Sequence, residues 1–340
     1  MNRKEVIRHV LAGKTPPVTP YLIEPTRNGK KKLAQYYDID INALESFMGN
    51  HLLYLNYSPP NDFIPEKLEK GLIKDEFGVT WDIERFNAIG DWGMVDHPVK
   101  DMSLDTYAFP KVGGKGRFDE TEKIVARNPD KFNLLQMLGI FEIPNRFAGM
   151  EDVMVGMAIS EDFANKSFDL ALEFNLGILS QLPYYVEGVR FIEDWGDQRG
   201  LMMGINYWRK YLKPRLKIMY EACKKSGRAV FIHSCGNITE VIPDLIELGV
   251  DVIDPIQPEV MDLRFIKKEY GKNIVFFGGV GSQSTIPLGT PEQVVEEAKR
   301  LLGFMAEDGK YILGPSGAIS TEAPVENVAA LIEFCKEMTG

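Results

Sequence analysis

The sequence has 340 residues, of which 44% are hydrophobic and 26% charged, and this composition excludes a disordered or collagen-like chain. Acidic residues outnumber basic ones by 49 to 39, and the net charge of −10 argues against binding to nucleic acid or to an anionic membrane. Three scattered cysteines are too few for a disulfide framework and indicate a reducing compartment. The start of the chain lacks the apolar segment of a secretory signal, and no stretch approaches the roughly 18 apolar residues of a membrane span. We therefore expect a cytoplasmic protein.

The first half of the chain is irregular. Periodicity predicts a strand at residues 18–23 and helices at residues 2–11, 29–37, 119–128 and 150–182. Residues 60–115 are rich in Gly, Pro, Asp and aromatic residues and read as an insertion, with hairpin-like pieces such as residues 77–83.

The second half alternates short apolar strands with amphipathic helices. Strands are expected at residues 186–194, 229–233, 251–254, 274–277 and 310–314, and helices at residues 207–226, 238–248, 262–270, 291–307 and 325–338. Pro214 is expected to kink the first of these helices, and Thr290 to cap the fourth. Continuous apolar strands joined by helices indicate a parallel sheet buried on both faces.

These units predict an α/β fold. About eight strand–helix units fit a (β/α)8 TIM barrel with an N-terminal extension and a loop or hairpin insertion. A doubly wound open sheet is the alternative, but no G-x-G-x-x-G follows a strand to support a dinucleotide site. No linker or repeat divides the sequence, so one domain is expected over residues 1–340.

Polar residues that follow the predicted strands are candidates for function, because a barrel gathers them at one mouth. His233 and Cys235 stand out, since residues two apart on a strand end point the same way and an imidazole and a thiolate suit zinc. The two residues alone favour a plainer interpretation, a packed cysteine and a histidine bonded to the backbone. Asp194 and Glu142 are candidate proton donors or ligands, or else acidic residues that favour a helix N-terminus. Asp254 has the same two interpretations.

Two long segments carry a resemblance to a known family. Residues 200–259, which contain His233-Ser234-Cys235, and residues 311–333 resemble the uroporphyrinogen decarboxylase-like superfamily, and looser similarity covers most of the chain. The resemblance implies a TIM barrel and one of two activities. One is cofactor-free decarboxylation of uroporphyrinogen, and the other is methyl transfer to or from a corrinoid protein. The second activity includes zinc-dependent methylcobalamin:thiol methyltransferases and the methyltransferases of O-demethylase systems, which act on methoxylated aromatics.

The resemblance disfavours a decarboxylase. Those enzymes carry an Arg-rich R-Q-A-G-R-Y element after the first strand, whereas only Arg27 of residues 24–29 offers an anion partner here. Their later G-H-G element is also missing, because Ser316-Gly317-Ala318 stands in its place.

The methyltransferase branch fits better. The resemblance implies His233 and Cys235 as metal ligands, but the position of the usual third ligand, a cysteine, is Gly317. A carboxylate of Glu142, Asp194 or Glu322 could complete such a site, and the sequence does not choose among them. A methyl ether, unlike a thiol, needs an electrophile or a proton donor for its departing oxygen.

We therefore expect a corrinoid-dependent methyltransferase that moves a methyl group from an aryl methyl ether to the Co(I) of a separate corrinoid protein. The expected catalytic residues are His233, Asp194 and Glu142; the expected substrate-binding residues are Arg27, Tyr207, Asp254, Gln257 and Ser316; and the expected metal ligands are His233 and Cys235, with zinc as an optional metal. The expected partners are the corrinoid (methylcobalamin) protein and a small methyl donor. The alternatives are a uroporphyrinogen decarboxylase, a zinc-dependent methylcobalamin:thiol methyltransferase, and a barrel without catalysis that binds a methylated ligand or a corrinoid protein.

Overall fold

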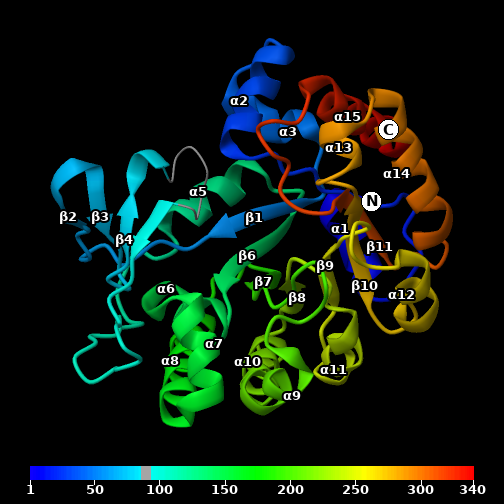
Figure 1. Ribbon diagram of the computed structural model, residues 1–340. Coiled ribbons are helices and arrows are strands. Elements are labelled where there is room, and N and C mark those ends of the chain that lie inside the picture. Colours follow the sequence, from blue (N-terminus) through cyan, green and yellow to red (C-terminus); the bar gives the residue numbers. More distant parts are fainter. Residues whose placement is uncertain (86–92) are drawn as a thin grey trace.

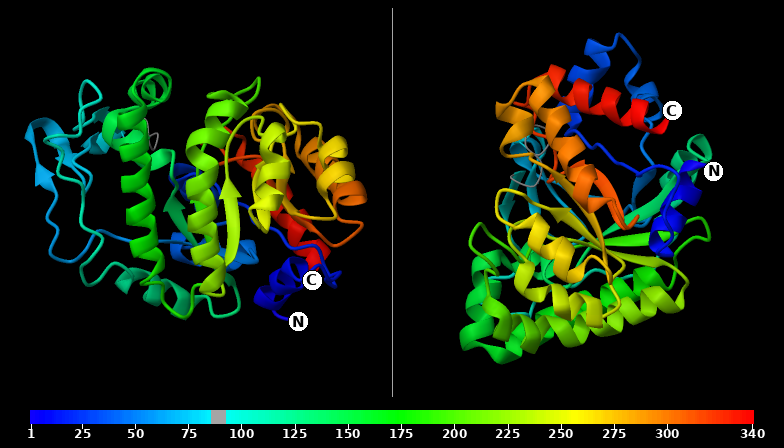
Figure 2. Two further views of the ribbon diagram at one scale, coloured as in Figure 1. Left: turned by 90° about the horizontal axis from the view of Figure 1, so that it is seen from below. Right: turned by 90° about the vertical axis from the view of Figure 1, so that its right-hand side faces the viewer.

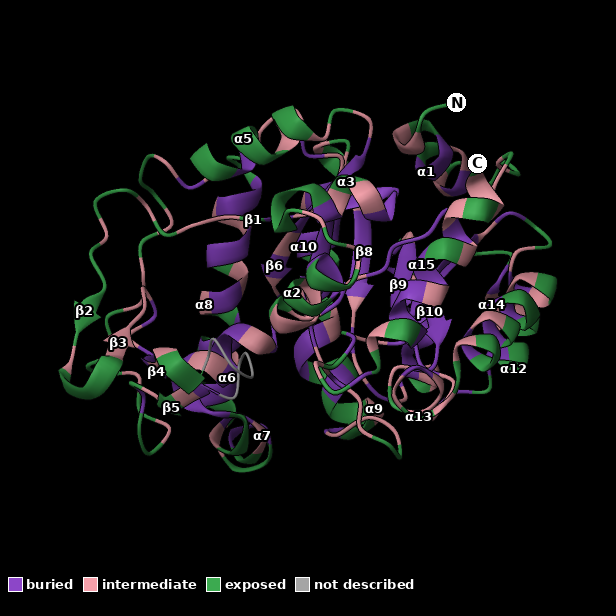
Figure 3. Ribbon diagram, turned by 90° about the horizontal axis from the view of Figure 1, so that it is seen from above, coloured by how far each residue is buried: buried purple, intermediate pink, exposed green. Residues whose placement is uncertain are grey.

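A curled sheet of seven parallel strands forms the centre of the computed structural model, which describes residues 1–85 and 93–340 (Figure 1). In spatial order the strands are β1 (Leu52–Asn56), β6 (Phe132–Leu138), β7 (Gly188–Ile192), β8 (Ala229–His233), β9 (Val252–Ile256), β10 (Val275–Val280) and β11 (Tyr311–Pro315). The strands are almost continuously buried, as expected for a parallel sheet covered on both faces (Figure 3).

Helices surround this sheet (Figure 2), and α1 (Arg3–Leu11) packs Ile7 and Val10 into a cluster with alternate residues of the strands. The other helices are α2 (Arg27–Tyr36), α3 (Leu44–Met48), α5 (Asp119–Arg127), α6 (Glu142–Ala148), α7 (Met150–Ile159), α8 (Glu161–Leu179), α9 (Gly204–Tyr207), α10 (Lys213–Lys225), α11 (Ile242–Glu247), α12 (Leu263–Tyr270), α13 (Thr285–Leu288), α14 (Pro291–Met305) and α15 (Val325–Thr339). Within the described ranges, no helix combines the length and apolar character needed to cross a membrane.

Most predicted helices are confirmed, and two are broken. Thr290 caps α14 in a capping box with Gln293, as its sequence indicates. The helix predicted over residues 150–182 divides into α7 and α8 at Ser160, whose backbone is not helical. The helix predicted over residues 207–226 contains a π-helical turn, and Pro214 lies in the first turn of α10, where its missing N–H is not needed.

An extended segment, residues 20–23, joins the two edges of the sheet. The Leu22 N–H donates to the Leu313 carbonyl of β11 over 3.0 Å, and on the other side the His51 N–H donates to the Tyr21 carbonyl over 3.0 Å. The pairing with β11 and the loop after it is limited to two isolated parallel bridges, Tyr21–Leu313 and Pro25–Ile319. The barrel predicted with eight strands therefore has seven regular strands and a closing seam of isolated contacts.

Proline explains why the strand predicted at residues 18–23 is reduced to this seam. Pro20 and Pro25 bracket the segment, and neither can donate a backbone hydrogen bond to a neighbouring strand.

The predicted insertion is a second, antiparallel sheet, although its residues 86–92 lie outside the described residues. Its strands are β2 (Glu66–Lys67), β3 (Leu72–Lys74), β4 (Thr80–Asp82) and β5 (Met94–Asp96). Arg117 fastens it to the barrel: its Nη2 lies 2.8 Å from Glu76 Oε2, and the two side chains are only 1% and 9% exposed. Arg117 also donates to the backbone carbonyls of Ser58, Val112 and Lys111.

Removing this guanidinium should loosen the insertion. Because Arg117→Leu leaves the Glu76 carboxylate buried without its partner, we expect a loss of roughly 3–5 kcal/mol in the free energy of unfolding. Urea denaturation would measure this loss. The control is Arg199→Ala, at a side chain that is 91% exposed, and its free energy of unfolding should stay within about 0.5 kcal/mol of the wild type. Equal stability of the two variants would contradict the anchoring role.

The closing seam should be sensitive to acid. Burial, and then the charge of Arg3, lower the pKa of His51 to about 4, and the Tyr21 N–H donates to His51 Nδ1. Because the folded pKa lies below the unfolded value of about 6.5, protonation favours the unfolded chain: the contribution is complete above pH 6.5 and is lost as the pH falls toward 4. We expect about 2 kcal/mol less stability at pH 5 than at pH 7 from this group.

Urea denaturation at both pH values would check this. His51→Gln, which does not titrate, should lose less stability on acidification than the wild type, whereas His9→Gln on α1 should show the wild-type drop. An undiminished drop in His51→Gln would overturn the assignment.

Candidate functional site

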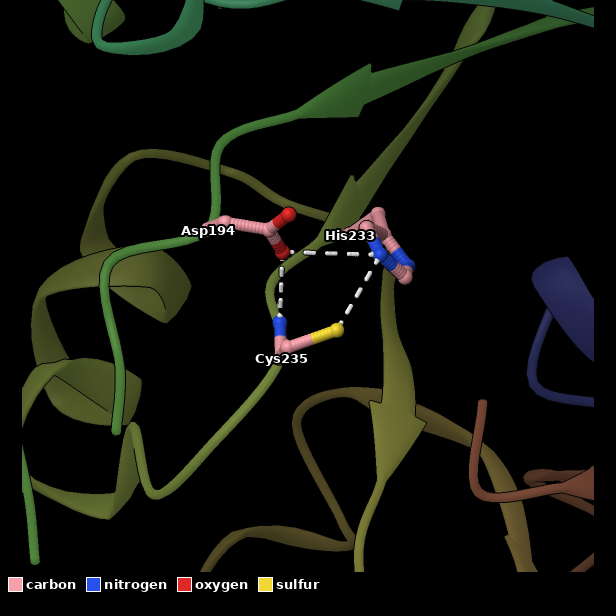
Figure 4. A group of neighbouring side chains, drawn as sticks. All are labelled: Asp194, His233 and Cys235. Atoms are coloured by element: carbon pink, nitrogen blue, oxygen red, sulfur yellow. Dashed lines mark hydrogen bonds and ion pairs between the residues drawn. The ribbon is translucent and has the colours of Figure 1, made fainter. Parts of the chain in front are cut away.

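Three side chains meet where β7 and β8 end (Figure 4). Ile192, the last residue of β7, pairs with His233, the last residue of β8. Two residues further along both segments, this register brings Asp194 level with Cys235, and Cys235 lies on the same side as His233. The His233 Nε2 lies 3.6 Å from Cys235 Sγ and 3.5 Å from Asp194 Oδ1. The Cys235 N–H donates to Asp194 Oδ1 over 2.8 Å, which fixes the carboxylate beside the thiol.

The spacing of these three ligand atoms fits a tetrahedral metal. With zinc bonds of about 2.3 Å to sulfur and about 2.1 Å to nitrogen or oxygen, tetrahedral ligands lie about 3.4–3.6 Å apart. The two distances from Nε2 match, and all three atoms lie within 4.8 Å of one another. Across residues 1–85 and 93–340, Asp194, His233 and Cys235 are the one such group, so Glu142 and Glu322 do not join it. Three protein donors with one position left over are typical of catalytic rather than structural zinc.

A buried arginine stands behind His233. Arg190, from the middle of β7, pairs with the Asp254 carboxylate through Nε and donates from Nη1 to Gln136 Oε1 over 2.6 Å. Its Nη2 lies 2.5 Å from His233 Nδ1. Because a guanidinium only donates, Nδ1 must accept, and the ring proton of a neutral His233 lies on Nε2, which faces Asp194 and Cys235.

This arrangement makes His233 a proton donor toward the site in the absence of metal. If Nε2 binds a metal instead, the ring proton moves to Nδ1 and needs an acceptor. The Asp254 Oδ2 lies 3.8 Å from Nδ1 and is the carboxylate placed for that role.

Burial and charge set the protonation of the surrounding groups. Burial alone would raise the pKa of Asp254, but the charge of Arg190, together with His233, holds that pKa below its usual range. Burial, and then the charge of Asp194, raise the pKa of the Cys235 thiol, which therefore stays protonated near neutral pH unless a cation stabilises the thiolate.

Glu193, the neighbour of Asp194, serves the fold instead. Its carboxylate accepts the N–H groups of Ile140 and Phe141 at 2.9 and 3.0 Å, in the loop after β6. Full burial raises its pKa to about 8. Adjacent acidic residues on one strand end thus point to opposite sides, one to the metal-ligand group and one to the backbone.

His233 and Cys235 open onto a cavity of about 220 Å³ in the mouth of the sheet. Four of the positions that the sequence indicated line this cavity: His233, Cys235, Asp254 and Gly317. Asp194 lies beside the cavity, in contact with His233 and Cys235. Gly317 lies across the cavity, so the loop after β11 reaches this site without supplying a ligand.

Sequence reasoning missed the charged wall residues Arg190 and Glu24. Arg190 lies over the face of Tyr54, with its guanidinium carbon 4.8 Å from the centre of the ring. Burial raises the pKa of Glu24. A charged residue inside an apolar strand, as in VEGVRFIED or PYLIEP, is the signal that could have identified Arg190 and Glu24.

Gln257 and Ser316 lie buried beside the cavity and hold its loops together. Gln257 accepts the Gly236 N–H at Oε1 and donates from Nε2 to the Ser316 carbonyl over 2.8 Å. Ser316 Oγ donates to Glu259 over 3.2 Å.

The remaining predicted residues lie apart from His233. Glu142 is in the first turn of α6 and accepts from Asn145 over 3.2 Å. Arg27 is exposed where α2 begins, and Tyr207 ends α9, 40% exposed and stacked on Tyr211.

Zinc affinity would test the three ligands. We expect Cys235→Ala and Asp194→Asn each to weaken zinc binding on the order of 100-fold, because each removes one charged donor from a three-donor site. Competition with a chelating dye would measure the affinity. Glu142→Gln is the matched control and should bind zinc like the wild type; an equal loss in this variant would argue against Asp194 as the third ligand.

Comparison with known proteins supports the family resemblance. Residues 185–338 match the family model of uroporphyrinogen decarboxylase (URO-D). A methylated-thiol–coenzyme M methyltransferase of Methanosarcina mazei is 21% identical over 276 residues, which are 78% of this chain and 72% of the relative. A methylcobamide:CoM methyltransferase of Methanosarcina acetivorans is 23% identical over 279 residues, 78% of this chain and 79% of the relative.

A solved structure agrees on the fold. A methyltransferase from Methanosarcina mazei superposes with a TM-score of 0.75 over 100% of both chains, at 17% identity. The predicted methyltransferase class is confirmed by the two relatives, whereas the predicted ether substrate is not tested by them. Residues 185–338 thus carry a uroporphyrinogen decarboxylase family domain, and the chain is an enzyme of the methyltransferase class, similar to the corrinoid-dependent branch of that superfamily.

Proposed function

We propose that this enzyme transfers a methyl group from an aryl methyl ether to the cobalt of a separate corrinoid protein. The observation that carries the proposal is the group of Asp194, His233 and Cys235, with Nε2 3.5 Å from the carboxylate and 3.6 Å from the thiol at the mouth of the sheet. A heteroatom bound there would lie at the floor of an open cavity, within reach of a partner protein docked over the mouth.

Zinc fits the three donors and would supply Lewis acidity that polarises the bond between the methyl group and the heteroatom. The donor set favours oxygen as that heteroatom. The family resemblance leads us to expect two thiolates, but here one of them is replaced by the carboxylate of Asp194. A harder set of donor atoms suits a harder substrate atom.

The chain's own residues would handle the charge on the departing oxygen. The methyl carbon leaves the ether oxygen, the electron pair of the broken bond stays on that oxygen, and the corrinoid cobalt provides the pair for the new bond. His233 Nε2–H is placed to donate to the oxygen when no metal is bound. Arg190 holds the imidazole in that tautomer, and Asp254 balances the buried charge of Arg190.

A thiol methyltransferase is the second candidate. The relatives act, by their names, on methylated thiols, methylcobamide and coenzyme M, and Cys235 and His233 are the ligand pair expected for zinc activation of a thiol. A uroporphyrinogen decarboxylase is disfavoured, because Arg190, the arginine in the cavity wall, is already engaged by Asp254, Gln136 and His233 and leaves no fork for a polycarboxylate.

A methyl-transfer assay would test the proposal. Reduced Co(I) corrinoid protein is incubated with the enzyme and a panel of methoxyarenes, methylated amines and methylated thiols, and the cobalt spectrum is followed. We expect conversion with a methoxyarene, and a loss of about 100-fold or more in rate for His233→Ala, because the variant lacks the proton donor of the metal-free site and equally the ligand of a metal-bound one.

His9→Ala, on α1 outside the mouth, is the control and should keep the wild-type rate. Full activity in His233→Ala would remove the assigned role. Conversion with methylated thiols alone would establish the second candidate, and a flat spectrum with a corrinoid protein that is competent in a control reaction would leave a binding protein or a decarboxylase.

A further inference from the structure

A second cavity, of about 270 Å³, lies between the barrel mouth and the insertion sheet. Its barrel side comes from strand ends, with Asn56 ending β1, Leu138 ending β6 and Ile192 ending β7. Its other side comes from the insertion, which lies beyond the carboxyl end of β1 (Figure 1). A cavity somewhat below the roughly 300 Å³ of the smallest drug-sized pockets is suited to a molecule with a single ring.

The cavity is connected to His233 by direct contacts. Ile192 is the register partner of His233, and Gln136, another wall residue, accepts from Arg190, which in turn contacts His233 Nδ1. Ile192 also precedes Asp194 by two residues and points to the same side, so a molecule lodged beneath the insertion would have one end next to the metal-ligand group.

Three aromatic side chains, Tyr57, Phe77 and Trp81, provide flat walls. Asp75 holds the side chain of Trp81 and the backbone at Phe77. Trp81 Nε1 donates to Asp75 Oδ2 over 2.8 Å, and the other oxygen of Asp75 accepts the N–H groups of Phe77 and Val79. Preorganised flat walls lower the entropic cost of binding a flat molecule.

The electrostatics of the walls disfavour a cation. Both carboxylates of the wall are engaged, Asp75 by the three donors above and Glu76 by Arg117. The aromatic faces already meet guanidinium groups: Arg146 lies 5.2 Å from the centre of the Trp81 ring and Arg117 lies 5.9 Å from that of Tyr57. A methylammonium group would have to compete with these cations for the same ring faces.

Neutral donors, by contrast, remain for an oxygen-bearing ligand. The Tyr57 hydroxyl and the Asn56 Nδ2 form no hydrogen bond with the residues that the structure describes, while Asn56 Oδ1 accepts from Gln136 over 3.2 Å. Burial raises the pKa of Tyr57, so the phenol stays protonated and able to donate.

We infer that this cavity binds the ring of the methyl donor, a neutral or anionic oxygenated aromatic molecule, and excludes cationic donors such as methylated amines. The inference rests on the proposed function for the identity of the donor, but the site itself is testable by binding alone. Tyr57 and Asn56 would hold the ring oxygens, and the aromatic walls would orient the ring with its methoxy group toward His233.

Calorimetric titration of the zinc-loaded enzyme, without corrinoid protein, would test the site. The probes are 2-methoxyphenol and tetramethylammonium. We expect 2-methoxyphenol to bind and tetramethylammonium to bind at least tenfold more weakly. Tyr57→Phe, which removes one hydroxyl and no internal hydrogen bond, should weaken binding of 2-methoxyphenol about three- to tenfold, the effect of one lost hydrogen bond.

Leu138→Phe would fill the cavity from the barrel side and should abolish binding of 2-methoxyphenol while zinc affinity stays unchanged, which also shows that the variant is folded. Tyr184→Phe, at a side chain that is 90% exposed, is the matched control for Tyr57→Phe and should bind like the wild type. Three results would each overturn the inference: 2-methoxyphenol does not bind, Leu138→Phe binds it as well as the wild type, or tetramethylammonium binds as tightly as 2-methoxyphenol.

The binding test and the cobalt assay together distinguish a failure of the proposed binding site from a failure of the proposed function. Binding that responds to both variants without methyl transfer in the cobalt assay would remove the proposed function and keep the site. Methyl transfer from 2-methoxyphenol that is unchanged in Leu138→Phe would keep the function and place the ring elsewhere.

Discussion

The buried charge of Arg190 is the constraint on which the rest of the site depends. Removing a guanidinium from water costs several kcal/mol unless partners replace the lost hydration, and here Asp254, Gln136 and His233 together engage it. Because a guanidinium only donates, the same contacts decide which nitrogen of His233 carries the proton. One buried cation thereby sets the direction of the imidazole, the charge of Asp254 and the proton that faces Asp194 and Cys235.

The two cavities divide the work of recognition between two parts of the chain. The mouth of the parallel sheet supplies charged and ligating groups from the ends of β7, β8 and β9, which are rigid because each strand is bonded on both sides. The insertion supplies aromatic surface, held by the Asp75 and Glu76 contacts on one small sheet. Gln136 contacts both regions through Arg190 and Asn56, so hydrogen bonds would connect a ring bound in the second cavity with His233.

The group of Asp194, His233 and Cys235 retains two of the three metal ligands that the family resemblance implies. His233 and Cys235 remain on one strand end, while Gly317 leaves the loop after β11 without a donor. Asp194, from the neighbouring strand, would take that coordination role if a metal binds, because its distance from Nε2 suits tetrahedral coordination. A carboxylate would keep the formal charge that a thiolate brings and would shift the preference of a bound metal toward oxygen, as the proposed ether substrate requires.

The sequence by itself determined the alternation of apolar strands and helices, the capping of α14 by Thr290, the insertion, and the pairing of His233 with Cys235, because each depends on neighbours within a few residues. Only the tertiary structure decided which carboxylate joins them. Glu142, Asp194 and Glu322 are equivalent in sequence, and the register of β7 against β8 alone brings Asp194 to 3.5 Å from His233. Arg190 and the closing seam were decided in the same way: a buried charge and a sheet edge are satisfied by partners dozens to hundreds of residues distant, which local pattern does not encode.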